Sequence, residues 1–374
     1  MHYTLDFISP KMRKLLSPGI SKSHFSEKKL CVSCYKNAFV VPFFDWGVSI
    51  GGLADNNKKV IIDLPQSEFA EGDSPFMEEE QIQSTETVIF LGVMIAIFGH
   101  TFTDNIRKLW FLQTDKYKKL IEKGARVVYV TENNQPLPPY SKEILSYVGC
   151  NIDSFVHISK LTQFKEIFVP DNSFFEENTG RCYTKEFIST ISQIKSNIFH
   201  LNYNFEVPNK IYLSRKEFSK QISWHKEYGE ETIEKEMNKN GFVSIQPEKY
   251  TFAEQVYIVQ HCKELATTEG SIAHITIFCK PHSKVVLFCK SRYMNIHQVA
   301  INQFADLDVT YVEAHHSMRV NKKEPWLGPF YLCVTKYFER FLGYKVPHIP
   351  FFLRLSFWKY MRIIRRLLKK IFKL

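Results

Sequence analysis

The sequence predicts an α/β protein in which a parallel sheet carries helices on both faces. The main observation is an alternation of short apolar strands with helices between residues 210 and 287. Strands are predicted at residues 210–215, 242–245 and 285–288, and a charged helix at residues 230–239. Strands that alternate with helices over this length are typical of parallel sheets.

Local signals set the ends of the helices in this stretch. Asn240-Gly241 is a pair that a helix C-terminus prefers. Thr251-Phe-Ala-Glu254 matches a capping box, so a second helix is expected from Thr251 to about Leu265. A short helix is expected over residues 272–278.

The turn at residues 266–271 lies at the centre of this half. Ligands of parallel sheets bind at the carboxyl ends of the strands, and both Arg215 and the Gly270-Ser271 turn fall there. The arrangement is typical of half of a nucleotide-binding fold.

The first half contains a second change from strand to helix. The apolar run at residues 88–98 predicts a buried strand, and residues 99–112 follow it as a helix. His100 and Asp104 are four residues apart, so they share one face of that helix. Other strands are expected at residues 30–44, 58–64, 125–130 and 164–169, a linking helix at residues 183–197, a helix with a loose connection at residues 1–29, and a loop or short helix at residues 70–87.

Length and charge limit the class of protein. A chain of 374 residues favours two domains. The net charge is +10, but residues 351–374 hold eight Lys or Arg and no acid, so the rest of the chain is close to neutral. This distribution argues against a nucleic-acid-binding body.

The basic segment at the C-terminal end predicts an amphipathic helix that lies on an anionic membrane surface. A helix that packs on the body is the alternative. The residues expected to contact the membrane are Trp358, Arg362, Arg365, Arg366, Lys369 and Lys370.

The sequence offers little sign of a metal site or of export. Only Cys31 and Cys34 of the eight cysteines form a C-x-x-C pair, and no second pair completes a zinc site. Free thiols in a reducing cytoplasm are therefore expected. Residues 1–20 lack the apolar core of a signal peptide, and residues 88–98 are too few to span a bilayer.

Three blocks of the sequence resemble glycosyltransferase family 61, in its bacterial capsule and exopolysaccharide branch. The first is Gly99-His100 with Asp104, Arg107 and Trp110-Phe111. The second is Ile211-Tyr-Leu-Ser-Arg215, followed by Gly229-Glu230-Glu231. The third is Pro247-Glu248, Glu254-Gln255 and Glu269-Gly-Ser-Ile-Ala-His274 through Phe278. The chain departs from the family at Ile275, where Asn is usual.

The resemblance implies a GT-B-like architecture of two Rossmann-like domains that face a cleft. The expected units are an acceptor domain at residues 1–200, a nucleotide-sugar domain at residues 201–320, a helical connection at residues 321–350 and the membrane-surface helix at residues 351–374. The family also implies inversion at the anomeric carbon without an obligatory metal, so no cofactor is expected.

Site residues follow from what glycosyl transfer needs. Ser214, Arg215 and the N–H groups of Gly270 and Ser271 are expected to hold the donor diphosphate, because guanidinium groups and helix N-termini bind phosphate. Glu269 is expected to contact sugar or ribose hydroxyls, with a plain helix-terminus charge as the alternative.

Two histidines have open assignments. His274 either binds the donor phosphate or is a satisfied core histidine. His100 is the first candidate for the base that takes the acceptor proton, and Asp104 either orients it or is itself the base. A helix-capping His with a solvated Asp is the structural alternative.

The predicted function is therefore an inverting transfer of a sugar, a hexose or an N-acetylhexosamine, from a UDP-linked donor to a lipid-linked oligosaccharide. The place expected for this reaction is the inner face of a bacterial plasma membrane. The alternative is a non-catalytic homologue that scaffolds polysaccharide assembly, an interpretation that rests on Ile275. The oligomeric state stays open.

Overall fold

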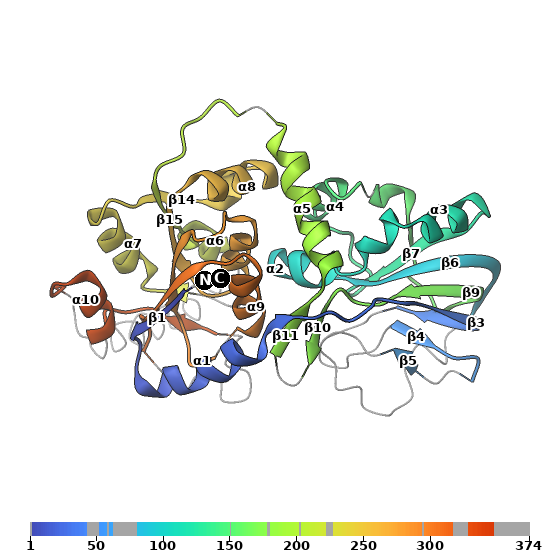
Figure 1. Ribbon diagram of the computed structural model, residues 1–374, viewed down its shortest axis with the longest axis horizontal. Coiled ribbons are helices and arrows are strands. Elements are labelled where there is room, and N and C mark those ends of the chain that lie inside the picture. Colours follow the sequence, from blue (N-terminus) through green and yellow to red (C-terminus); the bar gives the residue numbers. More distant parts are fainter. Residues whose placement is uncertain are drawn as a thin grey trace, which may run out of the picture.

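The computed structural model describes residues 2–42, 52–57, 60–62, 81–149, 151–177, 180–201, 203–221, 227–293, 295–316 and 328–347. Two sheets lie side by side, with helices packed around and between them (Figure 1). The predicted α/β fold is confirmed. The membrane-surface helix expected at residues 351–374 lies outside the described residues.

The C-terminal sheet has six parallel strands. Their order is β1 (His2–Phe7), β17 (Asp308–Glu313), β16 (Lys284–Cys289), β15 (Glu264–Thr268), β12 (Lys210–Leu213) and β14 (Val243–Ile245). The accompanying helices are α6 (Lys216–Gln221), α7 (Glu230–Lys239), α8 (Phe252–His261), the 3₁₀ helix η6 (Ser271–Phe278) and α9 (Ile296–Phe304). The capping box at Thr251 and Glu254 is present, as predicted.

Two predictions for this sheet are wrong. The helix that starts after Thr251 ends at His261 rather than near Leu265, because Cys262 is extended and the chain enters the buried strand β15. The first residues are an edge strand rather than part of a helix: β1 pairs with β17, and Tyr3 stacks on Tyr311 with ring centroids 6.3 Å apart. The helix α1 (Pro10–Lys22) follows it.

The N-terminal sheet has seven strands and is mixed. Its order is β5 (Val60–Ile62), β4 (Gly52–Ala54), β3 (Val32–Val41), β9 (Thr162–Pro170), β6 (Ile82–Met94), β7 (Arg126–Thr131) and β8 (Val156–His157). Only the β9–β6–β7–β8 part is parallel, so the Rossmann-like pattern expected of this half covers one side of its sheet. Strand β6 begins at Ile82, which corrects the loop or helix expected up to residue 87.

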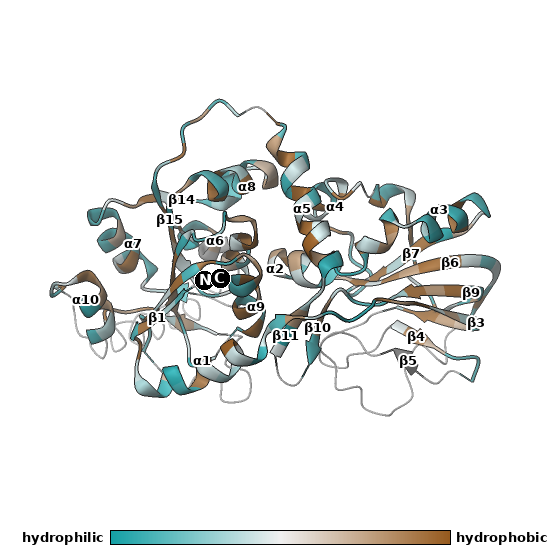
Figure 2. Cartoon of the chain, viewed as in Figure 1, coloured by the Kyte–Doolittle hydropathy of each residue, from teal (hydrophilic) through white to brown (hydrophobic). Residues whose placement is uncertain are grey.

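Three helices accompany this sheet. They are α3 (Asp115–Glu122), α4 (Pro139–Ser146) and α5 (Lys185–Phe199) (Figure 1). The helices α4 and α5 contact α8 of the other half, and α5 matches the predicted linking helix. Figure 2 shows the central strands β6, β7 and β9 as mostly apolar and α3 as mostly polar, and α3 buries none of its residues.

One hydrophobic core runs through both halves of the molecule. Phe102, from the first half, stacks on Phe252 with ring centroids 5.7 Å apart and meets the edge of Phe278 at 5.4 Å. All three rings are fully buried. The units expected at residues 1–200 and 201–320 therefore share a core, and the first unit supplies strand β1 to the sheet of the second.

Two smaller sheets complete the fold. The first consists of β10 (Phe174–Glu177), β11 (Gly180–Tyr183) and β2 (His24–Phe25). The second pairs β13 (Glu227–Tyr228) with β18 (Phe330–Tyr331), and the helix α10 (Lys336–Leu342) follows. Within the part of the chain that the structure describes, every helix is too short or too polar to cross a membrane.

Candidate active site

The first part of the candidate site is built on short, irregular turns. The single helix predicted over residues 99–112 is instead α2 (Phe98–His100), a π-helical turn η2 (Thr101–Asn105) and a 3₁₀ helix η3 (Leu109–Gln113). Single π-helical turns occur frequently at functional sites. The predicted apolar face is nevertheless present, because Phe102, Ile106 and Leu109 are buried.

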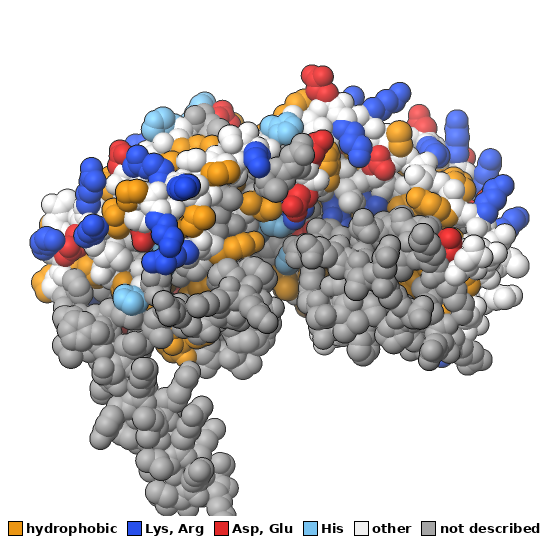
Figure 3. Space-filling view, turned by 90° about the horizontal axis from the view of Figure 1, so that it is seen from below, with side chains coloured by type: hydrophobic (Ala, Val, Ile, Leu, Met, Phe, Trp, Pro, Cys, Tyr) orange, Lys and Arg blue, Asp and Glu red, His pale blue; other side chains and the backbone are white. Residues whose placement is uncertain are grey.

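His100 and Asp104 contact each other directly. The Nδ1 atom of His100 lies 2.7 Å from Oδ2 of Asp104, and Thr103 Oγ1 donates to the same oxygen at 2.7 Å. The other carboxylate oxygen faces Arg107, 3.7 Å away. The side chain of His100 is 22% exposed to solvent, whereas the side chain of Asp104 is 1% exposed. Figure 3 shows histidine side chains at the surface between the two halves.

The charge state of Asp104 fixes the roles in this pair. Burial alone would raise the pKa of Asp104, but the hydrogen bond from His100 and the nearby charge of Arg107 hold the pKa well below its usual range. An ionised carboxylate only accepts hydrogen bonds, so Nδ1 of His100 carries the proton and Nε2 is the basic nitrogen of the ring. Asp104 thus orients His100.

Gly99 allows the two halves to meet at this point. A Cβ atom added to Gly99 would lie 2.7 Å from His274 Nδ1 and 2.9 Å from the Cα of Ser271. No real side chain tolerates such contacts, so glycine is needed for α2 to pack on η6. His100 is thereby held beside the Gly270-Ser271 turn.

His274 has partners for both of its ring nitrogens. Its Nδ1 donates to the carbonyl oxygen of Gly99 at 3.3 Å, and its Nε2 accepts from the side-chain amide of Asn295 at 3.2 Å. Burial lowers the pKa of His274 to about 4, so the ring is neutral near pH 7. Of its two proposed roles, these contacts favour the satisfied core histidine.

A third histidine joins this cluster. The ring centroid of His297 lies 6.2 Å from those of both His100 and His274. Its Nε2 lies 3.3 Å from Arg181 Nη2, which also pairs with Glu176. Burial, with the charge of Arg181, lowers the pKa of His297 well below its ordinary value. Its Nδ1 is buried and makes no hydrogen bond among the residues that the structure describes.

Two cations also lie beside the Gly270-Ser271 turn. Gly270 has φ of 128°, a conformation that is close to glycine-only. A Cβ atom there would lie 2.8 Å from Lys290 Nζ and 3.6 Å from Arg215 Nη1. Both cations therefore lie against the backbone of the turn.

Glu227 holds these two cations together. Its Oε1 atom lies 3.0 Å from Arg215 Nη1 and 2.7 Å from Lys290 Nζ, and Thr268 donates to its Oε2 at 3.2 Å. Burial would raise the pKa of Glu227, but Lys290 and Arg215 lower it, so the carboxylate is ionised. Burial lowers the pKa of Lys290, and Glu227 opposes that effect. The cluster of one anion and two cations carries net positive charge.

Ser214 and Glu269 lie close to this cluster in different ways. Ser214 is fully buried, and its Oγ accepts from the N–H of Lys216 at 3.3 Å. Glu269 is 5% exposed, and burial raises its pKa from an ordinary 4.5 to about 8. The Glu269 side chain is therefore mainly protonated near pH 7 and does not repel an anion. The protonated carboxyl group of Glu269 can donate a hydrogen bond to a bound anion.

Ile275 lies in the interior of the protein. Its side chain is 2% exposed and belongs to the hydrophobic core. The effect of this departure on donor binding stays a prediction.

The structure thus brings most of the sequence-predicted residues to one turn. Gly99, next to the His100–Asp104 pair, packs on Ser271 and His274, and Arg215 lies beside Gly270. Sequence reasoning missed Glu227, Lys290, Asn295, His297 and Arg181. Lys290 directly follows the strand β16, so its position at a carboxyl strand end was a usable signal.

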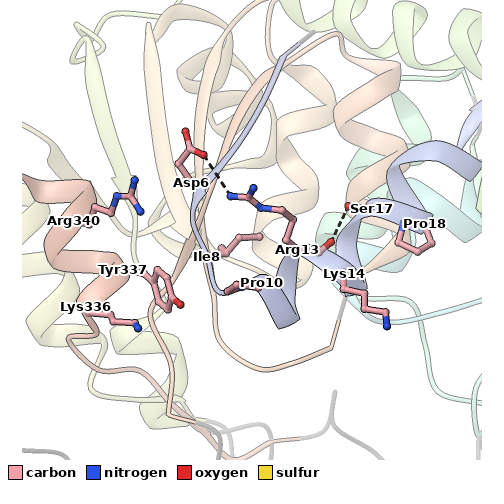
Figure 4. A pocket seen from close by; sticks show the side chains of 10 residues that line it. All are labelled: Asp6, Ile8, Pro10, Arg13, Lys14, Ser17, Pro18, Lys336, Tyr337 and Arg340. Carbon is pink, nitrogen blue, oxygen red and sulfur yellow. Dashed lines mark hydrogen bonds and ion pairs between the residues drawn. The ribbon is translucent and has the colours of Figure 1, made fainter.

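A pocket of about 900 Å³ lies elsewhere, between α1 and α10. Figure 4 shows Arg13 directed toward Asp6, with Lys336 and Arg340 across the pocket on α10. With Lys14, its lining carries four basic side chains and one acid. The pocket does not include the His100 pair or the Arg215 cluster, whose chemistry defines the candidate site.

The comparison with known families agrees with the site. The sequence matches the family model of Glycosyltransferase 61 over residues 98–286, about half of the chain. This range includes His100, Asp104, Arg215, Gly270 and His274. No curated protein matches the chain.

Proposed function

The chain belongs to glycosyltransferase family 61, and we propose that it transfers a sugar, with inversion, from a UDP-linked donor to a lipid-linked oligosaccharide. The proposed sugar is a hexose or an N-acetylhexosamine, and the proposed process is bacterial capsule or exopolysaccharide synthesis. As a member of this family the protein is a glycosyltransferase, which uses a nucleotide-sugar donor and an acceptor.

One observation carries the proposal: a single turn contacts both the segment of an oriented base and a cationic cluster. Gly99, which precedes His100, packs on Ser271, and Lys290 and Arg215 lie against Gly270. Glycosyl transfer needs a base at the acceptor and positive charge at the leaving diphosphate. The two halves of the chain would then face a shared site, in the manner of GT-B enzymes.

The His100–Asp104 pair supports direct displacement. Nε2 of His100 takes the proton of the acceptor hydroxyl while its oxygen attacks the anomeric carbon. The bond from that carbon to the diphosphate breaks, and the nucleoside diphosphate leaves with the bonding electrons. Asp104 keeps the ring in the required tautomer and stabilises the imidazolium that forms. This assigns the role of base to His100 rather than to Asp104.

The Arg215 cluster supports the leaving group. Arg215 and Lys290 supply charge beside the turn, and the N–H groups of Gly270 and Ser271 supply hydrogen bonds. Glu269, largely neutral near pH 7, is available to the sugar or ribose hydroxyls. Because these groups supply positive charge, we propose transfer without an obligatory metal or other cofactor.

A membrane location has two supports. Residues 351–374 carry eight basic residues at amphipathic spacing, and the pocket between α1 and α10 adds four more basic side chains on the body. Both favour an anionic lipid surface. We propose peripheral attachment at the inner face of the plasma membrane, where a lipid-linked acceptor is within reach.

Release of UDP tests the function. The purified protein is assayed with a panel of UDP-sugars and a short-chain lipid-linked acceptor, beside the variants His100→Ala and Arg215→Ala. We expect turnover of one sugar and a loss of about 10²–10⁴-fold in His100→Ala. His261→Ala and Arg126→Ala, which change an exposed histidine and an exposed arginine, are matched controls.

The outcomes separate the alternatives. Full activity of His100→Ala would reject His100 as the base and move that role to Asp104. Failure of the wild-type protein to bind any sugar nucleotide, measured by calorimetry, would favour the scaffold interpretation over an enzyme.

A further inference from the structure

A histidine, a glutamate and a cysteine meet beside the small sheet β10–β11–β2, away from the Gly270 turn. They are His24, Glu177 and Cys182, and their ligand atoms all lie within 4.8 Å of one another. They come from three separate strands of this sheet. We propose that these residues bind a zinc ion that fastens the N-terminal segment to the β10–β11 hairpin.

Two of the three ligand distances are close to the edges of a zinc tetrahedron. Cys182 Sγ lies 3.7 Å from His24 Nε2 and 3.7 Å from Glu177 Oε2, and all the ligand atoms lie within 4.8 Å of one another. Zinc bonds of about 2.3 Å to sulfur and 2.0–2.2 Å to nitrogen or oxygen place tetrahedral ligands about 3.5 Å apart. A turn of the exposed His24 ring and a shift of the exposed Glu177 side chain would bring the three ligand atoms to one ion.

His24 can offer one ring nitrogen to an ion. The Sγ atom of Cys182 lies 3.7 Å from Nε2 and 3.8 Å from Nδ1, so the imidazole ring must turn to direct Nε2 at an ion bound to Sγ. Nδ1 also lies 2.9 Å from the carbonyl oxygen of Lys22, to which it donates. Nε2 therefore carries the lone pair. Histidines that ligate metals almost always donate their other ring N–H to such an acceptor.

The backbone brings the ligands together. Cys182 is the register partner of His24 in the parallel pair β11–β2. A Cβ atom on Gly180 would overlap the carbonyl oxygen of Lys22, so only glycine permits this approach. Arg181 N also donates to Ser23 Oγ at 3.2 Å. The cluster is thus part of a specific junction.

The chemistry favours zinc over harder ions. Thiolate, imidazole and carboxylate groups are all ligands of Zn²⁺, whereas Mg²⁺ and Ca²⁺ prefer oxygen alone. Binding converts the Cys182 thiol to a thiolate and releases one proton to solvent. Three protein ligands leave the fourth position to water.

The location explains what such an ion would do. Along the chain, strand β2 follows α1, which contacts α9 of the C-terminal half, and precedes β3 of the N-terminal sheet. The neighbouring Arg181 contacts His297 of the candidate site. A zinc ion here would fix the crossing segment and the strand that carries Arg181.

Cobalt substitution tests the site in the full-length protein. After treatment with a chelator, the protein is titrated with Co²⁺, which reports thiolate ligation by a charge-transfer absorption band. We expect one Co²⁺ per chain and displacement by Zn²⁺. Cys182→Ser should lose the band, whereas Cys34→Ser, which changes an exposed thiol elsewhere, should keep it.

Glu177→Gln guards against a folding artefact, because this side chain is exposed and its loss should not disturb the core. We expect Glu177→Gln to bind Co²⁺ at least tenfold more weakly than the wild-type protein. Zn²⁺ should raise the Tm of the wild-type protein and have little effect on the Tm of the variant. The proposal is overturned if wild type gives no thiolate band, if Cys182→Ser keeps it, or if Glu177→Gln binds as tightly as wild type.

Discussion

His274 donates a hydrogen bond to the carbonyl oxygen of Gly99, 3.3 Å away, so the residue beside the proposed base is held by the opposite half of the chain. The candidate site therefore depends on contact between segments that are 175 residues apart.

Gly99→Ala should reduce both stability and activity. The added Cβ would lie 2.7 Å from His274 Nδ1 and 2.9 Å from backbone Cα of Ser271, so η6 must move away from α2. Overpacking of this kind costs about 1–3 kcal/mol. Urea unfolding and kcat/KM measure the two effects. Unchanged stability and activity of this variant would show that neither depends on the close contact between α2 and η6.

Asp104→Asn should lower kcat by at least about 10²-fold while the donor KM changes little. The amide introduced in this variant is uncharged, so it cannot stabilise the imidazolium that forms on His100. It can also donate a hydrogen bond to Nδ1 as well as accept one, so it does not fix the tautomer of the ring. A steady-state assay at saturating acceptor separates the two constants. Equal losses in His100→Ala, Asp104→Asn and the double variant would indicate that the pair acts as one unit.

Glu269→Gln should make the stability of the folded protein less dependent on pH. The folded-state pKa of about 8 lies above the ordinary 4.5, so the folded protein keeps a proton that the unfolded chain has lost. Stability therefore falls as pH rises between these two values, by up to about 3 kcal/mol at pH 7. Urea titrations at pH 5 and pH 8 should show this fall in wild type and a smaller one in the variant.

Lys290→Ala should weaken donor binding. One charge-assisted contact is worth about 1.5–3 kcal/mol, or roughly 10–100-fold in affinity. Calorimetry with UDP measures the effect, with the exposed Lys280→Ala as the control. Unchanged UDP affinity would place the diphosphate away from the Gly270 turn.

Phe102→Ala should destabilise the whole molecule, because its ring packs on Phe252 and Phe278 from the other half. A loss of about 3–5 kcal/mol is expected. Phe199→Ala removes a ring that is 68% exposed and should change stability by no more than about 0.5 kcal/mol. Two separate unfolding transitions in wild type would contradict a shared core.

Prediction from the sequence succeeded where local chemistry decides the structure. The capping box at Thr251 and the Asn240-Gly241 ending identified helix boundaries that the structure confirms at Thr251 and Lys239. It failed at β15, because the fate of Leu265–Thr268 depends on neighbouring strands rather than on the residues themselves. Strand β1 was missed for the same reason, since its partner lies about 300 residues away.

In the candidate site too, residues with a local sequence signal were predicted and residues placed by distant packing were missed. Arg215 and Gly270 follow strands and were identified by that position, and His100 and Asp104 were identified by helical spacing. Glu227, His297 and Arg181 reach the site through packing between distant segments. His24, Glu177 and Cys182 are also far apart in sequence and match no metal-binding spacing. Only the folded chain brings such groups together.

The pairing of β1 with β17 sets an order on how the chain must assemble during synthesis. His2–Phe7 leaves the ribosome some 300 residues before Asp308–Glu313, the strand with which it pairs. Until then β1 has an unpaired edge and the C-terminal sheet is incomplete. Contacts of such long range slow folding and lengthen the time in which strand edges are exposed. Strand β1 is therefore among the last strands to be paired during synthesis.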